Sequence, residues 1–517
     1  MSFMGFWDAA EHRPDHPATI DEAGTVTTFG ALRERVDRLS LGLRSRGIGV
    51  GDTVAVLLPN SVDLLAVQMA ALQIGAYFTP VNRHLTGAEC GYVVANSGSR
   101  VLVAHENYGG AAGEAADAAS LPAGDRFAVG TIEGFQSLRT LEDGFGGSVP
   151  DRTAGSVLLY SSGTTGRPKG IRRELSGRSP EEEFGKEGAR LAAFGLGSPD
   201  EVALAVAPLY HSAPNAVATS ALHLGQTVVL MERFEPRKSL ELAARHRVTC
   251  SFLVPTMFHQ WLALPEAERL SYDLSAFRVM VHSAAPCPMD TKRRMIDWVG
   301  PRLIEFYGTS ECSMVTWISS EQWLEHPGSV GRALPGLDLR IMDVDGKDLP
   351  PLEPGLIHVK GSGSFTYRGD PAKTADSWRK GYYISGDVGY LDEDGWLFMC
   401  DRRTDLILSG GVNIYPAEIE GELLQHPAVA DTVVIGVPHT EWGNTVVALV
   451  SLHAEGAATA EELEAHCRRT LAGFKVPRRF EFRDDLPRTP SGKMSRLRVR
   501  EGYLAQETAT REAQQEL

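Results

Sequence analysis

Hydrophobic and polar residues in the first part of the chain alternate with two different periods. Apolar residues between positions 32 and 43 recur at the spacing of one helix face, and a continuous apolar run at 54–58 has the length of a buried strand. A second helix is predicted at 62–72 and a further strand at 77–81. Strands that alternate with helices of this length predict a parallel sheet covered on both faces. The stretch 109–147, rich in Gly, Ala and Asp, is instead predicted to be a surface connection.

A second set of alternating elements runs from residue 201 to residue 285. Each of its four predicted strands ends in small or polar residues, and the strands are expected at 203–207, 227–231, 251–254 and 279–283. In open α/β sheets, ligands bind at the carboxyl ends of the strands. These strand ends are therefore the expected lining of a pocket.

The pattern changes twice in the second half of the chain. Between 336 and 398, short alternating strands separated by D-x-D-G and D-E-D-G turns indicate an antiparallel barrel or sandwich. After it, a helix at 417–424, strands at 431–437 and 445–452, and a helix capped by Thr459 are typical of a small α+β domain. The predicted fold is α/β: a large N-terminal domain of two doubly wound α/β subdomains and a small β-barrel-like subdomain, followed by a small α+β C-terminal domain.

Composition narrows the class of protein. A chain of 517 residues is too long for one hydrophobic core, so at least two domains are expected, and 43% hydrophobic with 23% charged residues is typical of a soluble globular protein. The net charge of -15, with no offsetting Lys/Arg cluster, argues against a nucleic-acid partner. The six cysteines form no C-x-x-C pair, which indicates neither a zinc site nor a disulfide framework and favours a cytoplasmic location. No signal peptide or membrane span is predicted.

The strongest chemical signal is the segment 158–170, with the sequence L-L-Y-S-S-G-T-T-G-R-P-K-G. A short apolar run enters a loop of small hydroxyl residues and glycines. Glycines let the backbone approach an anion, hydroxyls and N–H groups donate hydrogen bonds, and Lys169 adds a positive charge, so the loop suits phosphates. Its spacing does not match G-x-x-x-x-G-K-[ST], and Pro168 opposes a helix-starting dinucleotide motif. A solvated Ser/Thr/Gly turn is the alternative interpretation.

The ten residues from Ser161 to Gly170 resemble, residue for residue, the ATP-phosphate loop of the adenylate-forming superfamily, which includes acyl-CoA synthetases, firefly-type luciferases and peptide-synthetase adenylation domains. Further segments similar to the motifs of this superfamily follow in its order: S-A-A-P at 283–286, Y-G-T-S-E at 307–311, Y-I-S-G-D at 383–387, D-R-R-T-D-L-I at 401–407, S-G-G-V-N-I-Y-P at 409–416, F-K-V-P at 474–477 and P-S-G-K at 490–493. The resemblance covers nearly the whole chain.

The resemblance implies a nucleotide site. It assigns catalytic roles to Lys169, Ser310, Glu311 and Lys493, with Glu311 as the Mg²⁺ contact, because a carboxylate beside polyphosphate needs a hard cation between the like charges. Ser310 stands where the family usually has Thr, so it keeps the hydroxyl but loses the methyl that restrains the rotamer. The implied ATP- and AMP-binding residues are Ser161, Ser162, Gly163, Thr164, Thr165, Gly166, Ser283, Ala284, Ala285, Pro286, Tyr307, Gly308, Thr309, Asp387 and Arg402.

The resemblance also implies how the chain is divided. Residues 1–400 form the large adenylation domain, 401–404 the hinge, and 405–517 a small mobile domain that carries Lys493 to the reacting carboxylate and α-phosphate. Thr404 stands where many relatives have Asp or Lys, so the pivot itself is left open. The implied coenzyme-A channel consists of Ser409, Gly410, Gly411 and Lys475, where glycine leaves room for the pantetheine thiol.

The acyl pocket is assigned by the same resemblance. The segment 210–214 is similar to acyl- and aryl-CoA synthetases, and it lacks the Asp with which amino-acid adenylating domains hold a substrate amine. A carboxylic acid without an α-amine is therefore expected, and small side chains leave room for a bulky hydrophobic one. His211 is equally compatible with packing or with a gate. The implied pocket residues are His211, Ser212, Ala213 and Asn215.

The implied function is that of an ATP-dependent, AMP-forming acyl-CoA ligase. The acid attacks the α-phosphate of Mg-ATP to give acyl-AMP and pyrophosphate, and the thiol of coenzyme A then takes the acyl group. Two alternatives stay open: a ligase specialised for thioesterification of an adenylate supplied by a partner ligase, and a non-catalytic adenylate-binding protein. ATP, Mg²⁺, coenzyme A and a small carboxylic acid are the expected ligands, and a homodimer is left open.

Overall fold

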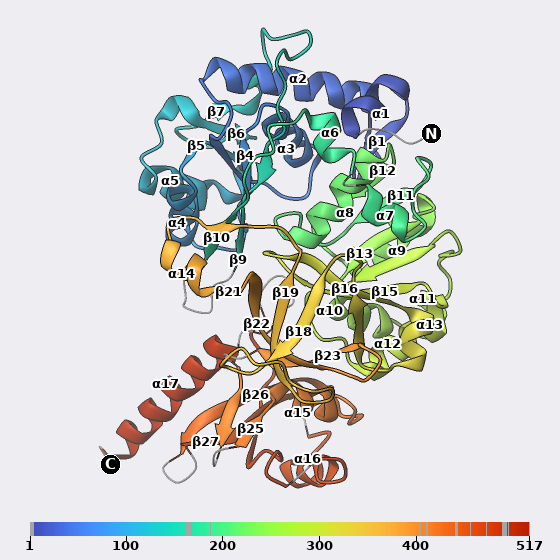
Figure 1. The fold of residues 1–517 in the computed structure, drawn as a ribbon, viewed down its shortest axis with the longest axis vertical. Coiled ribbons are helices and arrows are strands. Elements are labelled where there is room, and N and C mark those ends of the chain that lie inside the picture. The colour runs from blue at the N-terminus through green and yellow to red at the C-terminus, as the bar shows by residue number, and fades with distance from the viewer. Residues whose placement is uncertain are drawn as a thin grey trace.

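The computed structural model describes residues 5–161, 168–186, 188–402, 405–409, 412–439, 443–454, 456–471, 473–488, 494 and 496–515. Figure 1 shows a large mixed α/β N-terminal region and a smaller C-terminal region at one end of the molecule. This arrangement confirms the predicted fold class. None of the described helices combines the length and the apolar character needed to cross a lipid bilayer.

The first sheet is parallel throughout and is covered on both faces. In β3, Val54 and Val56 pack into one hydrophobic cluster with α2 and α3, whereas Ala55 and Leu57 pack into another with α4 and α5. This alternation follows from the twofold period of a strand. The strand order is β7 (Gln136–Ser137), β6 (Arg126–Val129), β5 (Ser99–His105), β3 (Thr53–Leu57), β4 (Tyr77–Pro80) and β8 (Ser156–Val157), and the helices are α2 (Phe29–Ser45), α3 (Val62–Gln73), α4 (Gly87–Ser97) and α5 (Gly109–Ala118).

The predicted elements of this first unit are present as β3, α3 and β4. The stretch 109–147 differs from the expectation, because it contains α5, strand β6 and the edge strand β7 rather than a plain surface connection. Alanines at positions 112, 115 and 116 are fully buried against α4 and β5, so their small side chains form a buried helix face. The composition of the stretch alone did not indicate this face.

The second sheet begins with strands from the N-terminus. Thr19 of β1 pairs with Val228 of β12, and the two strands are parallel. The first strand of the chain therefore belongs to a sheet whose other parallel strands lie about 200 residues further along the sequence. The other expected strands of this unit are present. The strand order is β2 (Val26–Thr28), β1 (Pro17–Ile20), β12 (Thr227–Leu230), β11 (Val202–Ala205), β13 (Cys250–Leu253), β14 (Val279–His282) and β15 (Leu303–Thr309), and the helices around them include α1 (Phe6–His12), α8 (Ser212–His223), α9 (Pro236–Arg245), α10 (Pro255–Leu262) and α12 (Met289–Val299).

Beyond β15 the strand pairing becomes antiparallel, as the turn signals indicated. The ladder continues without a break from the parallel strands, so the two parts share one strand order. The antiparallel strands are β16 (Ser313–Ser319), β17 (Ser329–Ala333), β23 (Leu397–Arg402), β22 (Tyr382–Leu391), β19 (Gly355–Lys360) and β18 (Asp338–Met342), with β21 (Trp378–Arg379) beside β22 and α13 (Ser320–Glu325) and α14 (Pro371–Asp376) between them.

A separate three-stranded sheet carries the two ends of the predicted phosphate loop. Strand β9 (Leu159–Ser161) pairs antiparallel with β10 (Lys169–Arg172), and Lys169 lies opposite Ser161. The third strand, β20 (Thr366–Tyr367), pairs with β10 through Ile171 and Tyr367. The loop residues 162–167 themselves lie outside the described residues. The strand predicted before the loop is therefore one arm of a hairpin, and Lys169 begins the other arm.

The C-terminal region has hydrophobic cores of its own. One core lies between α15, α16 and one face of the β26–β27 pair, and the other packs Val499 and Tyr503 of α17 against the opposite face. The predicted helix at 417–424 and the two predicted strands are present. The elements are β24 (Ile407–Ser409), β25 (Val412–Ile414), α15 (Pro416–Leu423), β26 (Val429–His439), β27 (Gly443–Leu452), α16 (Ala460–Cys467), β28 (Arg479–Phe482) and α17 (Arg496–Gln515).

Contacts between accessible side chains help to join this region to the rest of the chain. His453, which follows β27, stacks on His259 of α10 with a distance of 6.5 Å between ring centroids. Arg498 of α17 approaches Glu89 of α4 with 3.6 Å between the charged atoms. Both contacts are solvent-accessible pairs of the kind that contributes little to stability, which suits a region whose position can change.

A buried asparagine joins the two parallel sheets. Asn60 follows β3 and is 6% exposed; its amide donates to the carbonyl oxygens of Ala207 and Met231, each at 3.0 Å. Its side-chain oxygen accepts from the N–H of Leu209 at 2.8 Å. Because Ala207 and Met231 follow β11 and β12, one side chain holds the ends of strands from both sheets together.

We expect Asn60→Ala to lower the free energy of unfolding by about 1–3 kcal/mol, because buried backbone groups lose their partners. Urea unfolding followed by tryptophan fluorescence measures the change. Asn107→Ala is the matched control, since Asn107 is exposed and its side chain makes no hydrogen bond to a described residue. Equal unfolding midpoints for the two variants would contradict a role of Asn60 in joining the sheets.

Candidate active site

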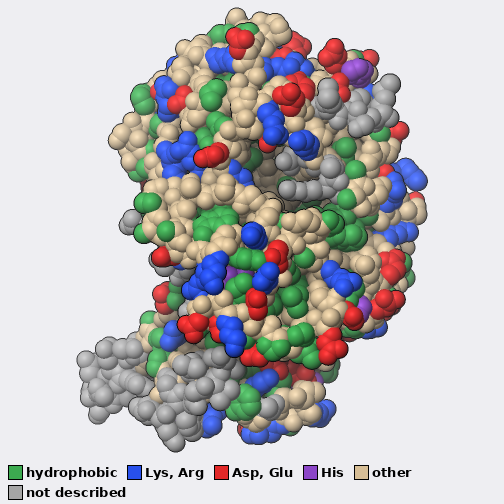
Figure 2. All heavy atoms as spheres, viewed as in Figure 1, with side chains coloured by type: hydrophobic (Ala, Val, Ile, Leu, Met, Phe, Trp, Pro, Cys, Tyr) green, Lys and Arg blue, Asp and Glu red, His purple; other side chains and the backbone are tan. Residues whose placement is uncertain are grey.

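A cavity of about 3380 Å³ lies at the carboxyl ends of the central parallel strands and extends to the C-terminal region. Its volume exceeds that of a site for one small ligand, typically about 300–1,000 Å³, which leaves room for a nucleotide and a second substrate together. On the face drawn in Figure 2 the surface is hollowed toward the middle of the molecule, and basic and acidic side chains are interspersed around it. The pocket expected at the strand ends is therefore present.

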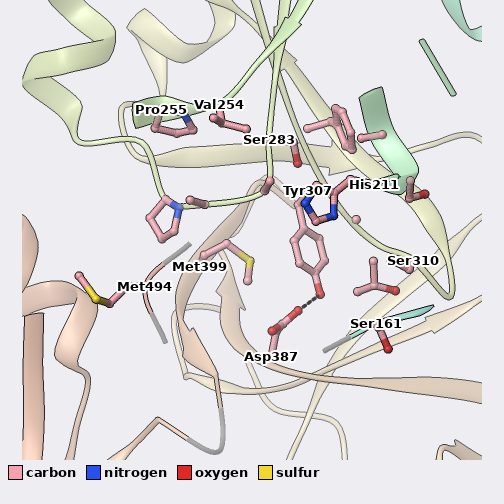
Figure 3. Close-up of a pocket in the computed structure, with 18 of the residues that line it drawn as sticks. Ser161, His211, Val254, Pro255, Ser283, Tyr307, Ser310, Asp387, Met399 and Met494 are labelled. Carbon is pink, nitrogen blue, oxygen red and sulfur yellow. Dashed lines mark hydrogen bonds between the residues drawn. The ribbon is translucent and has the colours of Figure 1, made fainter. Parts of the chain in front are cut away.

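Tyr307 and Asp387 form the best-defined polar contact in this cavity. The Tyr307 hydroxyl donates to Asp387 Oδ2 at 2.8 Å, as the dashed line in Figure 3 marks. Burial and the adjacent carboxylate both raise the pKa of Tyr307, so the phenol stays protonated and keeps donating. Asp387 pairs in register with Arg402 across β22 and β23. The two residues that the resemblance assigns to the ribose thus lie opposite each other in the backbone, although the side chain of Arg402 is not described.

Gly308 sets the direction of the chain between Tyr307 and Glu311. The β15–β16 pairing shifts register at this point, and a Cβ added to Gly308 would lie 1.9 Å from the carbonyl oxygen of Ser313. Real Cβ atoms never approach another atom so closely, so only glycine permits the tight turn. The bulge brings Tyr307, Ser310 and Glu311 to the same cavity, because all three are among its lining residues. Tyr307 and Ser310 can be followed in Figure 3.

Glu311 is held by a tyrosine that the sequence motifs did not indicate. The Tyr367 hydroxyl donates to Glu311 Oε1 at 2.9 Å, and both residues are less than 10% exposed. The Lys169 ammonium lies 5.5 Å from the centre of the Tyr367 ring. Burial is the main cause that lowers the pKa of Lys169, while it raises that of Tyr367. Since β20 pairs with β10, Tyr367 connects the acidic residue to the hairpin of the phosphate loop.

Arg173 provides a second link to the same turn. Its guanidinium donates to the carbonyl oxygens of Ser310 and Glu311, at 3.2 and 2.6 Å. Arg173 directly follows β10, and Tyr367 lies in the strand that pairs with β10, so the three-stranded sheet contacts the Y-G-T-S-E turn through two side chains. Neither residue lies in one of the sequence motifs, and only the strand pairing reveals these contacts.

The segment from Ser283 to Pro286 borders the cavity as expected, and Ala284 has a left-handed φ of 78°. Behind it lies a buried ion pair that the sequence did not predict: Lys292 of α12 donates to Glu305 Oε2 at 2.5 Å. Glu305 pairs in register with His282 of β14. Burial keeps the pKa of His282 well below its ordinary value. The ion pair therefore joins α12, which follows the loop with the candidate adenine contacts, to β15, which pairs with the strand before that loop.

The candidate acyl residues divide into two kinds. His211, Ser212 and Ala213 are half-buried at the start of α8 and border the cavity. Asn215 is 4% exposed, and its amide exchanges hydrogen bonds with Gln68 at 2.8 and 2.9 Å and donates to the carbonyl oxygen of Leu209 at 3.0 Å. These hydrogen bonds are all internal, which fits a role in positioning the turn before α8.

One predicted residue of the small domain, Lys475, borders the cavity and forms an ion pair with Glu418 at 2.6 Å. Ser409 does not border it, and its hydroxyl donates to the carbonyl oxygen of Asn444. Met494, labelled in Figure 3, borders the same cavity and directly follows Lys493 in the chain. Outside the described residues lie Ser162, Gly163, Thr164, Thr165, Gly166, Thr404, Gly410, Gly411 and Lys493.

Comparison with known proteins identifies the family. Residues 6–367 match the family described as AMP-binding enzyme, and residues 418–493 match the AMP-binding enzyme C-terminal domain. The chain therefore belongs to the AMP-binding enzymes of the adenylate-forming superfamily and is an AMP-forming ligase. This confirms the resemblance that was inferred from the order of the motifs.

Individual relatives match along nearly their whole length. The chain is 36% identical to a feruloyl-CoA synthase from an Amycolatopsis species, covering 97% of this chain and 99% of the relative. It is 32% identical to 2-succinylbenzoate–CoA ligase of Bacillus licheniformis, covering 95% and 98%. Among solved structures, ATP-bound MatB from Rhodopseudomonas palustris is similar, with a TM-score of 0.83, 30% identity and coverage of 97% and 99%.

Tyr367→Phe removes one hydrogen bond to the Glu311 carboxylate without changing the ring. Hydrogen bonds to charged groups contribute about 1.5–3 kcal/mol, so we expect ATP-dependent pyrophosphate release to fall roughly tenfold or more. Steady-state kinetics at several Mg²⁺ concentrations measure the effect. Tyr382→Phe is the matched control, because it removes a similar bond to Asp338 outside the cavity. Equal rates in both variants would leave Tyr367 with a packing role.

Proposed function

We propose that the protein is an acyl-CoA ligase that activates a bulky hydrophobic carboxylic acid with ATP and transfers the acyl group to coenzyme A. The observation that carries the proposal is the convergence of Tyr307, Asp387 and Glu311 in one cavity with the ends of the phosphate hairpin. The names of the relatives support it, because feruloyl-CoA synthase and 2-succinylbenzoate–CoA ligase both join an acid to coenzyme A.

In the adenylation half-reaction, the phosphate hairpin and the Y-G-T-S-E turn contact the phosphates of ATP. Lys169 faces the polyphosphate, and Ser310 offers a hydroxyl to the α-phosphate. Asp387 accepts from the ribose hydroxyls, with Arg402 as the second contact, since a carboxylate can accept from both hydroxyls of a diol. The acid enters beside His211, and its carboxylate attacks the α-phosphorus with release of pyrophosphate.

Glu311 suits a Mg²⁺ contact. Its buried carboxylate accepts from Tyr367 at one oxygen, which leaves the other to face the cavity. Mg²⁺ is usually bound by one or two carboxylates together with substrate phosphates rather than by a cage of protein ligands. Consistently, the described part of the chain contains no group of three or more His, Cys, Asp or Glu that could hold a metal ion. When bound, the ion neutralises charge that develops on the phosphates.

In the thioester half-reaction, the small domain turns about the hinge at 401–404 and presents another face to the cavity. The proposed hinge motion removes Lys493 and brings the loop with Gly410 and Gly411 alongside the pantetheine path. The thiol attacks the acyl carbon, the bond to the phosphate oxygen breaks, and AMP leaves. The pairs His453–His259 and Arg498–Glu89 are accessible contacts of a kind that contributes little to stability, which supports this motion.

The experiment that tests the function is pyrophosphate release from ATP with a panel of carboxylic acids, followed by thioester detection after addition of coenzyme A. Both products are expected with at least one bulky hydrophobic acid. Pyrophosphate without thioester would overturn the choice of coenzyme A as acceptor. Thioester only from synthetic acyl-AMP would favour the ligase specialised for one half-reaction, and neither product would favour an adenylate-binding protein.

We expect Lys493→Ala to slow acyl-AMP formation by roughly a hundred- to a thousandfold, because a charge contact that forms in the transition state is lost. Thioester formation from synthetic acyl-AMP and coenzyme A should stay near the wild-type rate, since the rotated domain carries residue 493 away. Both half-reactions are measured in one preparation, so a folding defect would reduce both. An equal loss in both half-reactions would contradict the proposal that the small domain changes position between them.

Gly411→Leu is expected to slow acyl transfer to coenzyme A while pyrophosphate release continues, because a large side chain fills the pantetheine path. Rapid-quench measurement of the two products separates the steps. Gly502→Leu serves as control, since Gly502 lies in α17 with no atom within 4 Å of an added Cβ. If the glycine at 411 does not border the path, both half-reactions of Gly411→Leu will match those of the control.

A further inference from the structure

One face of α8 borders the cavity along the whole helix. Ala213, Ala216, Val217 and Ser220 recur at intervals of three and four residues, so they lie on the same side, and His223 is the last residue of that face. A helix of this length spans about 18 Å at 1.5 Å per residue. The cavity therefore follows α8 from the candidate carboxylate end near His211 to a far end at His223.

Apolar and aromatic residues form much of this far part. Phe184, Leu191 and Phe194 border the cavity there, and Phe252 and Phe306 border it from the central strands. Polar residues that border it nearby include Ser176, Glu183 and Ser220. Small residues on the helix and large rings opposite it leave an elongated space for an apolar group. Alone, this shape would accept any long hydrophobic acid.

His223 introduces one polar group at the end of the space. The residue is 3% exposed, and its ring stacks on Phe184 at 5.2 Å between centroids with an interplanar angle of 6°. Burial lowers its pKa to about 3, so the imidazole is neutral throughout the physiological range. A neutral imidazole carries one N–H donor and one acceptor nitrogen.

The hydrogen bond to the N-terminal helix decides which nitrogen carries the proton. The backbone N–H of Phe6 donates to His223 Nδ1 at 3.1 Å, so Nδ1 is the acceptor and the proton is on Nε2. Nε2 has no hydrogen-bond partner among the residues that the structure describes. It is also not one of the fully buried nitrogens without a partner, so part of its surface is accessible. The imidazole borders the cavity, so its N–H is available to a group inside it.

We propose that His223 is the specificity-determining residue of the acyl site, and that the acid substrate is elongated and apolar with an oxygen acceptor at the end remote from its carboxylate. The inference rests on the proposed function and names its substrate class. The Nε2–H donates to a hydroxyl, ether or carbonyl oxygen of the bound acyl group. A site that contains a buried donor rejects an analogue without the acceptor, because the donor is then left unpaired.

Matched pairs of acids test this directly. In each pair the two acids have the same shape, but only one has the remote oxygen: 4-methoxycinnamic against 4-ethylcinnamic acid, and 12-hydroxydodecanoic against tridecanoic acid. Pyrophosphate release gives kcat/KM for each acid, and the ratio within a pair is the readout. We expect the wild-type protein to favour the oxygenated member of at least one pair by roughly tenfold, the effect of one hydrogen bond.

Two variants link the preference to the side chain. His223→Phe keeps the stacked ring and removes the donor, so the ratio should fall to about one, whereas His223→Gln keeps both a donor and an acceptor and should retain part of it. A loss of stability lowers both rates of a pair equally and leaves the ratio unchanged. An unchanged ratio in His223→Phe, or a wild-type ratio near one in both pairs, overturns the inference. No pyrophosphate with any acid overturns the proposed function as well.

Discussion

The close backbone contact at Gly308 is the constraint on which the candidate site depends. It accommodates the register shift between β15 and β16, and the residues on either side of it border one cavity. Tyr307, before the bulge, contacts Asp387 on the antiparallel side, and Glu311, after it, contacts Tyr367 of the strand that pairs with the phosphate hairpin. A larger residue at 308 would separate the proposed sugar contacts from the proposed phosphate contacts.

Buried polar contacts then fix the surroundings of this turn. Asn60 joins the ends of strands from two sheets, the Lys292–Glu305 pair supports the loop at Ser283, and Arg173 donates to the turn itself. Each of these side chains satisfies backbone or charged groups that would otherwise be unpaired in a low-dielectric interior. These contacts hold the surroundings of the proposed nucleotide site in place, while accessible contacts attach the C-terminal region.

Much of this site follows from the sequence, because its motifs are contiguous. Tyr307, Asp387 and Lys169 lie in short segments whose order identifies the superfamily, and the alternation of periods identifies the α/β fold. Contacts between distant segments were not predictable in this way. Tyr367 is 56 residues from Glu311, and His223 resembles an ordinary residue at a helix end until the N–H of Phe6 is seen beside it. The pairing of β1 with β12 was missed for the same reason, since no local pattern reports it.

That pairing has a consequence for the synthesis of the protein. Strand β1 is translated well before its parallel partner β12, because Thr227–Leu230 follows it by more than 200 residues. At about 5–20 residues per second, the delay is on the order of 10 to 40 seconds. During this interval β2 can already pair with one edge of β1, but the edge that later pairs with β12 is unpaired. Chaperone binding to the emerging chain would therefore protect this unpaired edge until β12 has been translated.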